Sequence, residues 1–286
     1  MSPLARLSAS AALALVLIGM PAVVSAGGAL DDVREEVRDS SRDDDDRDDD
    51  RDDDWDDCDD DEESVLGAVI GEVFGPPIFY AVSTPWWGPH VVLGDEWGFQ
   101  AEFPDAPYHG GHDGYLLIES PGVGRTVSAR LSAEYGSDFN GLTRVGTRLL
   151  VDTSSRLGFE TEWSQWTEEV RGGHDSLSTG DFNAIVRFAQ NEKVQLRSGI
   201  GFNWLADSHD SDFGVNLTYG ADFFPARPWV VSTTLDWGTL GDAVLFRARG
   251  SVGVIWKCAE VFAGYDFQRF GSADLHGPMI GLRLWY

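Results

Sequence analysis

Cysteine is scarce in this sequence of 286 residues, which has only two, Cys58 and Cys258. They lie 200 positions apart and therefore match no zinc-binding or redox motif, whose cysteines are spaced a few residues apart. Basic residues are scarce too: 21 Lys and Arg stand against 48 Asp and Glu, for a formal net charge of -27. Because nucleic acids demand a basic surface, this balance excludes a nucleic-acid-binding protein.

Sequence fingerprints of common enzymes are missing as well. There is no G-x-S-x-G, no P-loop and no dinucleotide-binding fingerprint, and glycine-rich patches such as 122–124 are typical of turns. After residue 26 no run is apolar enough to cross a membrane as a helix, which takes about 20 residues. We therefore find neither a familiar catalytic motif nor a helical membrane span.

Residues 1–26 have the features of a secretory signal peptide. Arg6 supplies a positive charge, residues 11–20 form an apolar core, and Val24-Ser25-Ala26 resembles a small-residue cleavage site. No cysteine follows that site, which argues against a lipoprotein anchor. We expect the chain to be exported.

From Thr126 the sequence alternates apolar and polar residues, which is the period of a β-strand. Ten runs show this period, and each has one uncharged face. They are 127–135, 143–151, 157–163, 182–188, 194–204, 213–223, 229–237, 244–256, 261–267 and 280–286.

The opposite face of these runs carries their charges, among small and polar residues. We expect it to line the lumen of a barrel. Its charged residues are Arg130, Glu134, Arg144, Arg148, Glu160, Glu162, Arg187, Arg197, Asp222, Asp236, Arg247, Arg249, Glu260, Asp266 and Arg283.

Three features favour a transmembrane barrel over a soluble one with an apolar interior. The uncharged face is too bulky for the inside of a small barrel. Aromatic residues fall near both ends of the runs, as in the girdles of membrane barrels. Connections alternate in length, with long outward loops at 164–181 and 268–277 and shorter inward ones.

The signal peptide, the even number of alternating runs and the closing run from Met279 to the aromatic Tyr286 together resemble the bacterial outer-membrane β-barrel class. The resemblance covers residues 126–286 and implies an all-β, antiparallel up-and-down barrel. Ten strands are expected, with eight or twelve as alternatives. It also implies that the lipid bilayer and the barrel-assembly machinery, which reads the terminal aromatic residue, are partners.

Residues 27–64 form an acidic segment ahead of the barrel. Positions 31–63 hold 22 acidic residues and five arginines, with almost nothing to bury, so we expect a disordered, periplasmic spacer. Its carboxylates suit weak Ca²⁺ or Mg²⁺ binding, although no EF-hand spacing is present. No other cofactor is expected.

Residues 65–125 are rich in proline, glycine and aromatic residues. Because proline interrupts a strand ladder, we expect an irregular segment, with short strands at most near 98–103 and 115–119. It would act as a plug inside the barrel or as a periplasmic cap. If 98–119 paired with the barrel, the strand number would rise to twelve.

The two cysteines lie on the same side of this arrangement, Cys58 in the tail and Cys258 in a tight inward turn. They are either two unpaired thiols or a disulfide that ties the acidic tail to the base of the barrel.

His-Asp pairs recur in expected outward loops, at His174-Asp175 and His209-Asp210. A His-Asp pair can activate a water molecule, and the placement loosely resembles that of omptin-type outer-membrane proteases. The same four residues would suit Zn²⁺. The alternative is that they are polar loop residues without a chemical role.

Eight arginines and a similar number of acids in a narrow barrel should pair across its lumen. We therefore expect a closed, charge-paired interior and a non-enzymatic protein with a structural or surface-interaction role. The alternatives are a narrow solute or ion channel, and a hydrolase borne on the outward loops.

Overall fold

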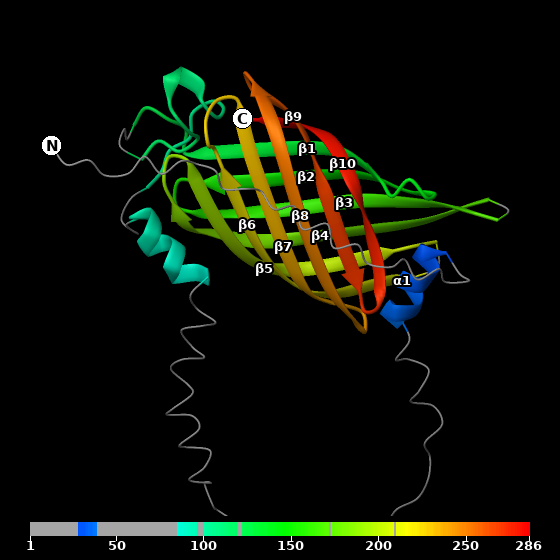
Figure 1. The fold of residues 1–286 in the computed structure, drawn as a ribbon. Coiled ribbons are helices and arrows are strands. Elements are labelled where there is room, and N and C mark those ends of the chain that lie inside the picture. Colours follow the sequence, from blue (N-terminus) through cyan, green and yellow to red (C-terminus); the bar gives the residue numbers. More distant parts are fainter. Residues whose placement is uncertain (1–27, 39–84, 96–99, 119–121, 172, 209) are drawn as a thin grey trace, which may run out of the picture.

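The computed structural model describes residues 28–38, 85–95, 100–118, 122–171, 173–208 and 210–286. Its main body is a closed barrel of ten antiparallel strands, in which each strand pairs with its neighbour in the sequence and β1 closes against β10 (Figure 1). The predictions of an all-β, up-and-down barrel and of ten strands are confirmed.

The strands are longer than the runs from which they were predicted. Their bounds are β1 Val127–Ser137, β2 Leu142–Thr153, β3 Leu157–Val170, β4 Gly173–Gln190, β5 Val194–Ala206, β6 Ser211–Phe223, β7 Trp229–Leu240, β8 Ala243–Trp256, β9 Ala259–Phe270 and β10 Ala273–Trp285.

The expectation of long outward loops is wrong. Most of 164–181 belongs to β3 and β4, which stay paired as far as Val170 and Gly173, and most of 268–277 belongs to β9 and β10. Polar residues there continue the backbone ladder beyond the apolar stretch, so the loss of hydrophobic alternation did not mark the strand ends. Loop length therefore gives no support for a membrane location.

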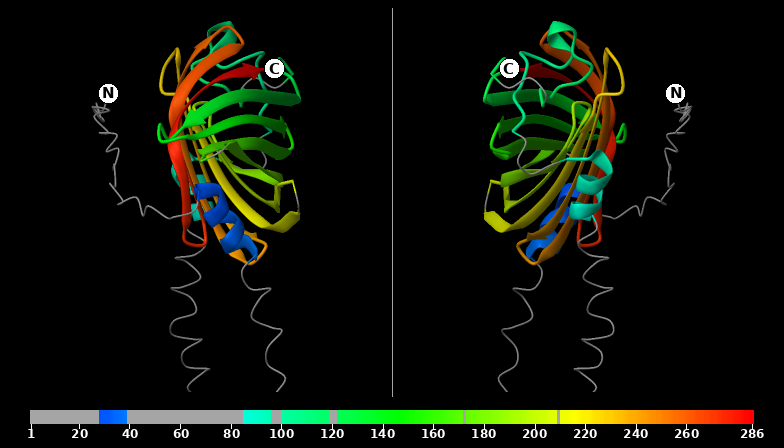
Figure 2. Two further views of the ribbon diagram at one scale, coloured as in Figure 1. Left: turned by 90° about the vertical axis from the view of Figure 1, so that its right-hand side faces the viewer. Right: turned by 90° about the vertical axis from the view of Figure 1, so that its left-hand side faces the viewer.

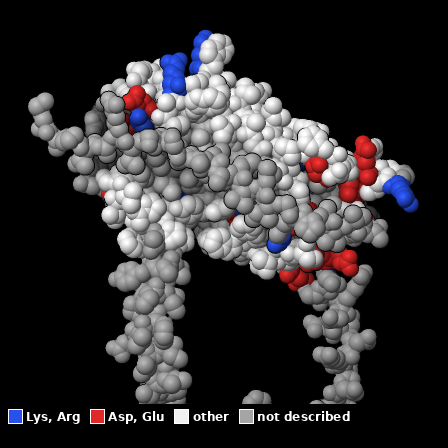
Figure 3. All heavy atoms as spheres, in the orientation of Figure 1, with Lys and Arg blue, Asp and Glu red and all other residues white. Residues whose placement is uncertain are grey.

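The two faces of the barrel differ as the alternation requires. Along β8, buried and exposed residues alternate from Ala243 to Trp256, with one intermediate position at Ala248. Large apolar side chains stand exposed around the outside, among them Leu131, Val145, Trp163, Ile200, Phe213, Leu235, Val254, Val261, Ile280 and Leu284. On the face seen in Figure 3, most of the visible charged residues lie toward the two ends of the barrel.

The two ends of the barrel are covered by different parts of the chain (Figures 1 and 2). Helix α1, Ala29–Arg38, packs at the end formed by the β1–β2, β3–β4, β5–β6, β7–β8 and β9–β10 turns, which we call the α1 end. Residues 100–118 pack against Phe224 and Trp285 at the opposite end, where the chain also terminates. We call that segment the cap and that end the cap end.

The expectation that residues 27–64 form a disordered spacer is wrong for Ala29–Arg38, which is helical and packed. Only 28–38 of that segment is described, and the signal peptide lies outside the described residues. The cap includes a short 3₁₀ turn, η2 His109–Gly111, and isolated bridges that join Glu102 to Leu117 and Phe103 to Arg125. These bridges lie outside the barrel, so the described part of 98–119, residues 100–118, adds no strand to it.

Residues 85–93 are helical and lie against the outside of β6. The Tyr219 hydroxyl donates a hydrogen bond to the carbonyl of Pro85 at 2.9 Å, and the Trp86 ring meets Tyr219 edge to face. None of the helices in the described ranges is long and apolar enough to cross a membrane.

Candidate functional site

The lumen is the part of the molecule where charged residues from many strands meet. Nearest the α1 end, three carboxylates and three guanidinium groups form one cluster, with Arg247 bonded to Glu162 at 2.6 Å and to Asp266 at 2.7 Å. Arg144 on β2 contacts Glu134 on the neighbouring strand β1 at 2.7 Å and also reaches Asp266 on β9 at 2.8 Å. The members come from β1, β2, β3, β8 and β9 and are Glu134, Arg144, Glu162, Arg247, Arg249 and Asp266.

A second cluster lies toward the cap end. Arg197 joins Asp222 at 2.6 Å and Glu160 at 3.2 Å, and Arg148 also pairs with Glu160. Arg130 reaches Asp222 at 3.0 Å. Gly220 makes this possible, since a Cβ there would lie 2.7 Å from the guanidinium carbon of Arg197.

A third pair connects the lumen to the cap. Arg283 contacts Glu260 at 2.8 Å, and the indole N–H of Trp285 donates to the other oxygen of Glu260, also at 2.8 Å. Trp285 in turn packs against Tyr115 of the cap, with ring centroids 4.9 Å apart. Near the same end, Arg187 contacts Asp152 at 3.4 Å.

The fifteen charged residues that we predicted for the lumen lie on the inner face of the structure. Fourteen are buried with exposed fractions of 8 % or less: Arg130, Glu134, Arg144, Glu160, Glu162, Arg187, Arg197, Asp222, Asp236, Arg247, Arg249, Glu260, Asp266 and Arg283. The fifteenth, Arg148, has a side chain that is 15 % exposed and paired with Glu160.

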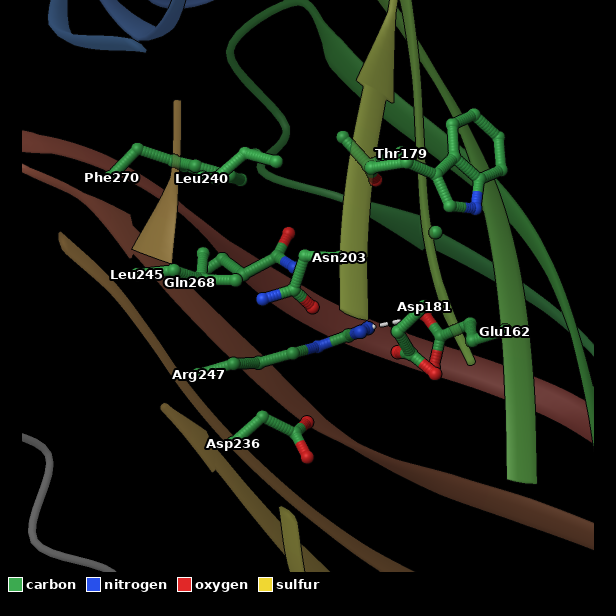
Figure 4. A pocket seen from close by; sticks show the side chains of 12 residues that line it. Glu162, Thr179, Asp181, Asn203, Asp236, Leu240, Leu245, Arg247, Gln268 and Phe270 are labelled. Atoms are coloured by element: carbon green, nitrogen blue, oxygen red, sulfur yellow. Dashed lines mark hydrogen bonds and ion pairs between the residues drawn. The ribbon is translucent and has the colours of Figure 1, made fainter. Parts of the chain in front are cut away.

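These contacts leave little open space. The remaining lumen cavities each have room for about one or two water molecules. Figure 4 shows a lumen cavity on the α1 side, where Arg247 points toward Glu162 and Asp181, and Asp236 lies on its other side. Ion pairs of this kind carry a large desolvation cost, so their main effect is to specify one arrangement of the walls.

Helix α1 closes one end through an apolar face. Leu30, Val33 and Val37 have exposed fractions of 0 %, 0 % and 1 %. They pack on a ring of side chains from the strand ends, which consists of Leu142, Trp166, Leu177, Leu205, Leu240, Ala243, Leu245, Phe270, Ala273 and Leu275.

Polar contacts fix the direction of α1 on this ring. The carboxylate of Glu168 on β3 accepts the backbone N–H groups of Ala29 and Leu30 at 2.9 and 3.0 Å, at the helix N-terminus, where a negative charge is favourable. Arg34 binds both oxygens of Asp175, at 2.6 and 2.8 Å. These hydrogen bonds raise the pKa of Arg34 above its usual value. Arg38 pairs with Asp212 at 2.9 Å.

The cap closes the opposite end by aromatic packing. Tyr115 contacts Phe103, Phe224 and Trp285, and the Tyr108 hydroxyl donates to the carbonyl of Trp229 at 2.7 Å. Burial raises the pKa of Tyr108 to about 12.

One carboxylate of the cap stabilises the turn that follows the cap in the sequence. Glu102 accepts the backbone N–H groups of Gly122 and Gly124 at 2.8 and 2.7 Å. Both bonds lower the pKa of Glu102, because they stabilise its charged form.

The three described His and Asp candidates, His174, Asp175 and Asp210, do not form a metal or catalytic cluster. Asp175 is bonded to Arg34, His174 faces Glu169 across the β3–β4 ladder, and Asp210 accepts the N–H of Ser211 at 2.8 Å. His209 lies outside the described residues. Within the described part of the chain, no group of three or more His, Cys, Asp and Glu is placed to hold a metal ion.

The possible disulfide stays a prediction. Cys258 is exposed in the turn between β8 and β9, at the cap end, and Cys58 lies outside the described residues.

The docked helix is the feature that sequence reasoning missed. Leu30, Val33 and Val37 follow a spacing of three and four residues, which is the signal of an amphipathic helix. We predicted a disordered spacer instead, because the residues around these three are mostly charged.

A closed, even-stranded antiparallel barrel with an apolar exterior and a charged interior has the architecture of the bacterial outer-membrane β-barrel class. No protein-family model matches the sequence, and no curated protein matches it.

Solved structures similar to this chain belong to that class. The N-terminal β-barrel domain of Pseudomonas aeruginosa OprF has 10 % identity and a TM-score of 0.28, over 56 % of this chain and 97 % of that one. Ail of Yersinia pestis has 12 % identity and a TM-score of 0.27, over 56 % and 96 %. The β domain of the Bordetella autotransporter BrkA has 10 % identity and a TM-score of 0.30, over 56 % and 98 %. Similarities this weak add no argument about function, which has to come from the chain itself.

Proposed function

We propose that this protein is an integral barrel of the bacterial outer membrane with a closed lumen, and that its role is structural or surface-interacting. The observation that supports this most directly is the lumen itself. Ion pairs such as Arg130–Asp222 and Arg247–Glu162 join opposite walls across it, and α1 and the cap cover its ends. Such an interior offers no continuous water-filled path.

The outer surface supports a lipid partner. A belt of exposed Leu, Val, Ile, Phe and Trp side chains would be costly in water, whereas hydrocarbon accommodates it. The helix at 85–93 adds Trp87, Val91 and Val92 to the outside, with exposed fractions of 47 %, 66 % and 85 %. A short helix that exposes aromatic and apolar side chains suits a membrane interface. The closing strand to Tyr286 is the element that we expect the assembly machinery to read.

The same proposal gives the barrel a direction. An even number of strands brings the start of β1 and the end of β10 to one side, which in this class is the periplasm. Helix α1 would then lie at the outer rim. From the sequence we expected the N-terminal tail to lie in the periplasm. The orientation proposed here instead places α1 on the outer side of the membrane.

Planar-bilayer conductance tests the closed lumen. We expect no reproducible single-channel steps from the full-length protein, and none from a variant that lacks 29–38, because the ion-pair clusters remain. Steps in both proteins would contradict the proposal. Steps only in the truncated variant would support the second candidate, a narrow channel closed by α1, which is favoured by the docking of α1 on an apolar ring across the barrel mouth.

We also propose that the protein is not an enzyme. Asp175 is committed to Arg34, which removes the acid from the His174-Asp175 pair. The test is hydrolysis of peptide and ester substrates by the wild type and by alanine variants of His174, Asp175, His209 and Asp210. Turnover by the wild type that these substitutions abolish would restore the hydrolase.

A further inference from the structure

One of the lumen cavities is lined by guanidinium and hydroxyl groups, with no carboxylate. Six strands supply its walls, and their side chains are Arg130, Ser132, Arg148, Leu150, Arg197, Ser232, Thr234, Arg249, Ser251 and Arg283. The carboxylates that pair with these arginines lie outside this lining. A cavity lined by five guanidinium groups and four hydroxyl groups, with no carboxylate, is complementary to an anion.

The ion pairs around this cavity do not balance. Seven arginines (Arg130, Arg144, Arg148, Arg197, Arg247, Arg249 and Arg283) contact six carboxylates (Glu134, Glu160, Glu162, Asp222, Glu260 and Asp266). Within this set the arginines outnumber the carboxylates by one. Two further buried carboxylates, Asp181 and Asp236, form no ion pair with a described residue and line a different cavity, on the α1 side.

Two donors beside the cavity are unused. The Nε atoms of Arg148 and Arg249 are buried and donate no hydrogen bond to any described residue. Arg249 as a whole is 8 % exposed, so water reaches it only from within the lumen. A buried guanidinium N–H without an acceptor costs free energy, and an anion in the cavity would remove that cost.

We propose that this cavity is a binding site for one small inorganic anion of the halide class. The size of the cavity, about that of one water molecule, excludes larger oxyanions and organic acids. The anion would interact with the five arginines that line the cavity and hold the β1, β2, β5, β7, β8 and β10 walls together. It would be a structural ligand of the closed lumen.

Bromide is the probe, because it scatters anomalously and substitutes for chloride. Crystals of the full-length protein grown in sodium bromide should show an anomalous peak between Arg148 and Arg249. In solution, the thermal midpoint should rise saturably with bromide, when bromide replaces gluconate at constant ionic strength. Gluconate is too large for the cavity and serves as the reference salt.

Two arginine variants form a matched pair. Arg148→Gln removes a cavity-lining arginine, and Arg144→Gln removes one that contacts Glu134, Glu162 and Asp266 but does not line this cavity. In both cases every carboxylate that loses a partner keeps another arginine. We expect the bromide concentration for half the effect to rise at least tenfold in Arg148→Gln and to stay within twofold in Arg144→Gln.

Should Arg148→Gln not fold, Ser251→Ala is the substitute, because it removes a lining hydroxyl without touching an ion pair. It should raise the half-effect concentration severalfold. The proposal is overturned by water alone in the cavity, by a bromide peak at crystal concentration with no saturable shift in solution, or by equal bromide responses in the wild type and the lining variants.

Discussion

The most informative perturbation is Leu30→Ala, which tests whether α1 is a docked element in its own right. Leu30 is 0 % exposed and sits at the N-terminal end of the apolar face of α1, within the ring of strand-end side chains. Replacing a fully buried leucine by alanine costs about 2–5 kcal/mol, because the lost contacts are only partly recovered by relaxation. Since about 1.4 kcal/mol corresponds to a factor of ten, α1 should dock about 30- to 3,000-fold less tightly.

Hydrogen exchange of the peptide that contains 28–38 measures this directly in detergent or in lipid. Docked, its amides are protected by the helix and by the contacts with Glu168. In Leu30→Ala, the protection factors of these amides should fall about 30- to 3,000-fold. The fall is smaller for any amide that exchanges without undocking of α1. The strands should keep their protection, because their ladder closes independently of α1.

Glu35→Ala is the control, since Glu35 lies on the exposed face of the same helix. It should change protection by less than about threefold, because exposed substitutions alter stability by about 0.5 kcal/mol or less. The reasoning is refuted if Leu30→Ala leaves the exchange of 28–38 unchanged. It is equally refuted if the strands lose protection in parallel, because α1 would then be part of the cooperative barrel rather than a docked element.

Three further predictions test the membrane, the orientation and the cap. Leu235→Arg places a charge near the middle of β7 on the outer face, where the residue is 39 % exposed; in lipid vesicles it should lower the free energy of unfolding by about 2–4 kcal/mol, whereas Val244→Arg near the α1 end should cost about 1 kcal/mol or less. Equal and negligible effects would contradict a lipid-facing belt. A Glu35→Cys variant should react with a membrane-impermeant maleimide on intact cells, in a Cys58→Ser/Cys258→Ser background; labelling only after the outer membrane is permeabilised would place α1 on the periplasmic side. Tyr108→Phe removes the 2.7 Å hydrogen bond to Trp229 and should weaken the cap by about 0.5–1.5 kcal/mol. Because the pKa of Tyr108 is raised from 10.0 to about 12, its stabilising effect is complete below pH 10 and is lost as the pH rises through 12. Proteolysis of the cap at increasing pH should show that loss in the wild type and not in Tyr108→Phe, and identical profiles would contradict the assignment.

The barrel itself was predictable from local pattern. Alternation along a run such as 244–256 identifies a strand and separates its two faces, because successive side chains point to opposite sides. The strand ends were not predictable, because β3 and β4 continue as a polar ladder after their apolar residues stop. Because backbone pairing needs no apolar side chain, hydrophobic alternation underestimates the length of the paired strands.

The lumen was predictable in composition and not in detail. The alternation assigns Arg148 and Arg197 to the inner face, but it cannot show that both reach Glu160 on a third strand. That depends on the stagger of the strands around a closed barrel, which shifts residues of neighbouring strands along the axis. The same stagger brings five arginines around one cavity.

The sequence by itself determined the class of fold and the division into an apolar outside and a charged inside. Only the tertiary structure decided what closes the barrel. Leu30, Val33 and Val37 need the ring of strand-end side chains before their burial becomes favourable, and that ring exists only when five hairpins are brought together. A charged decapeptide lacks enough apolar surface to order itself, so its helix follows from the barrel on which it docks.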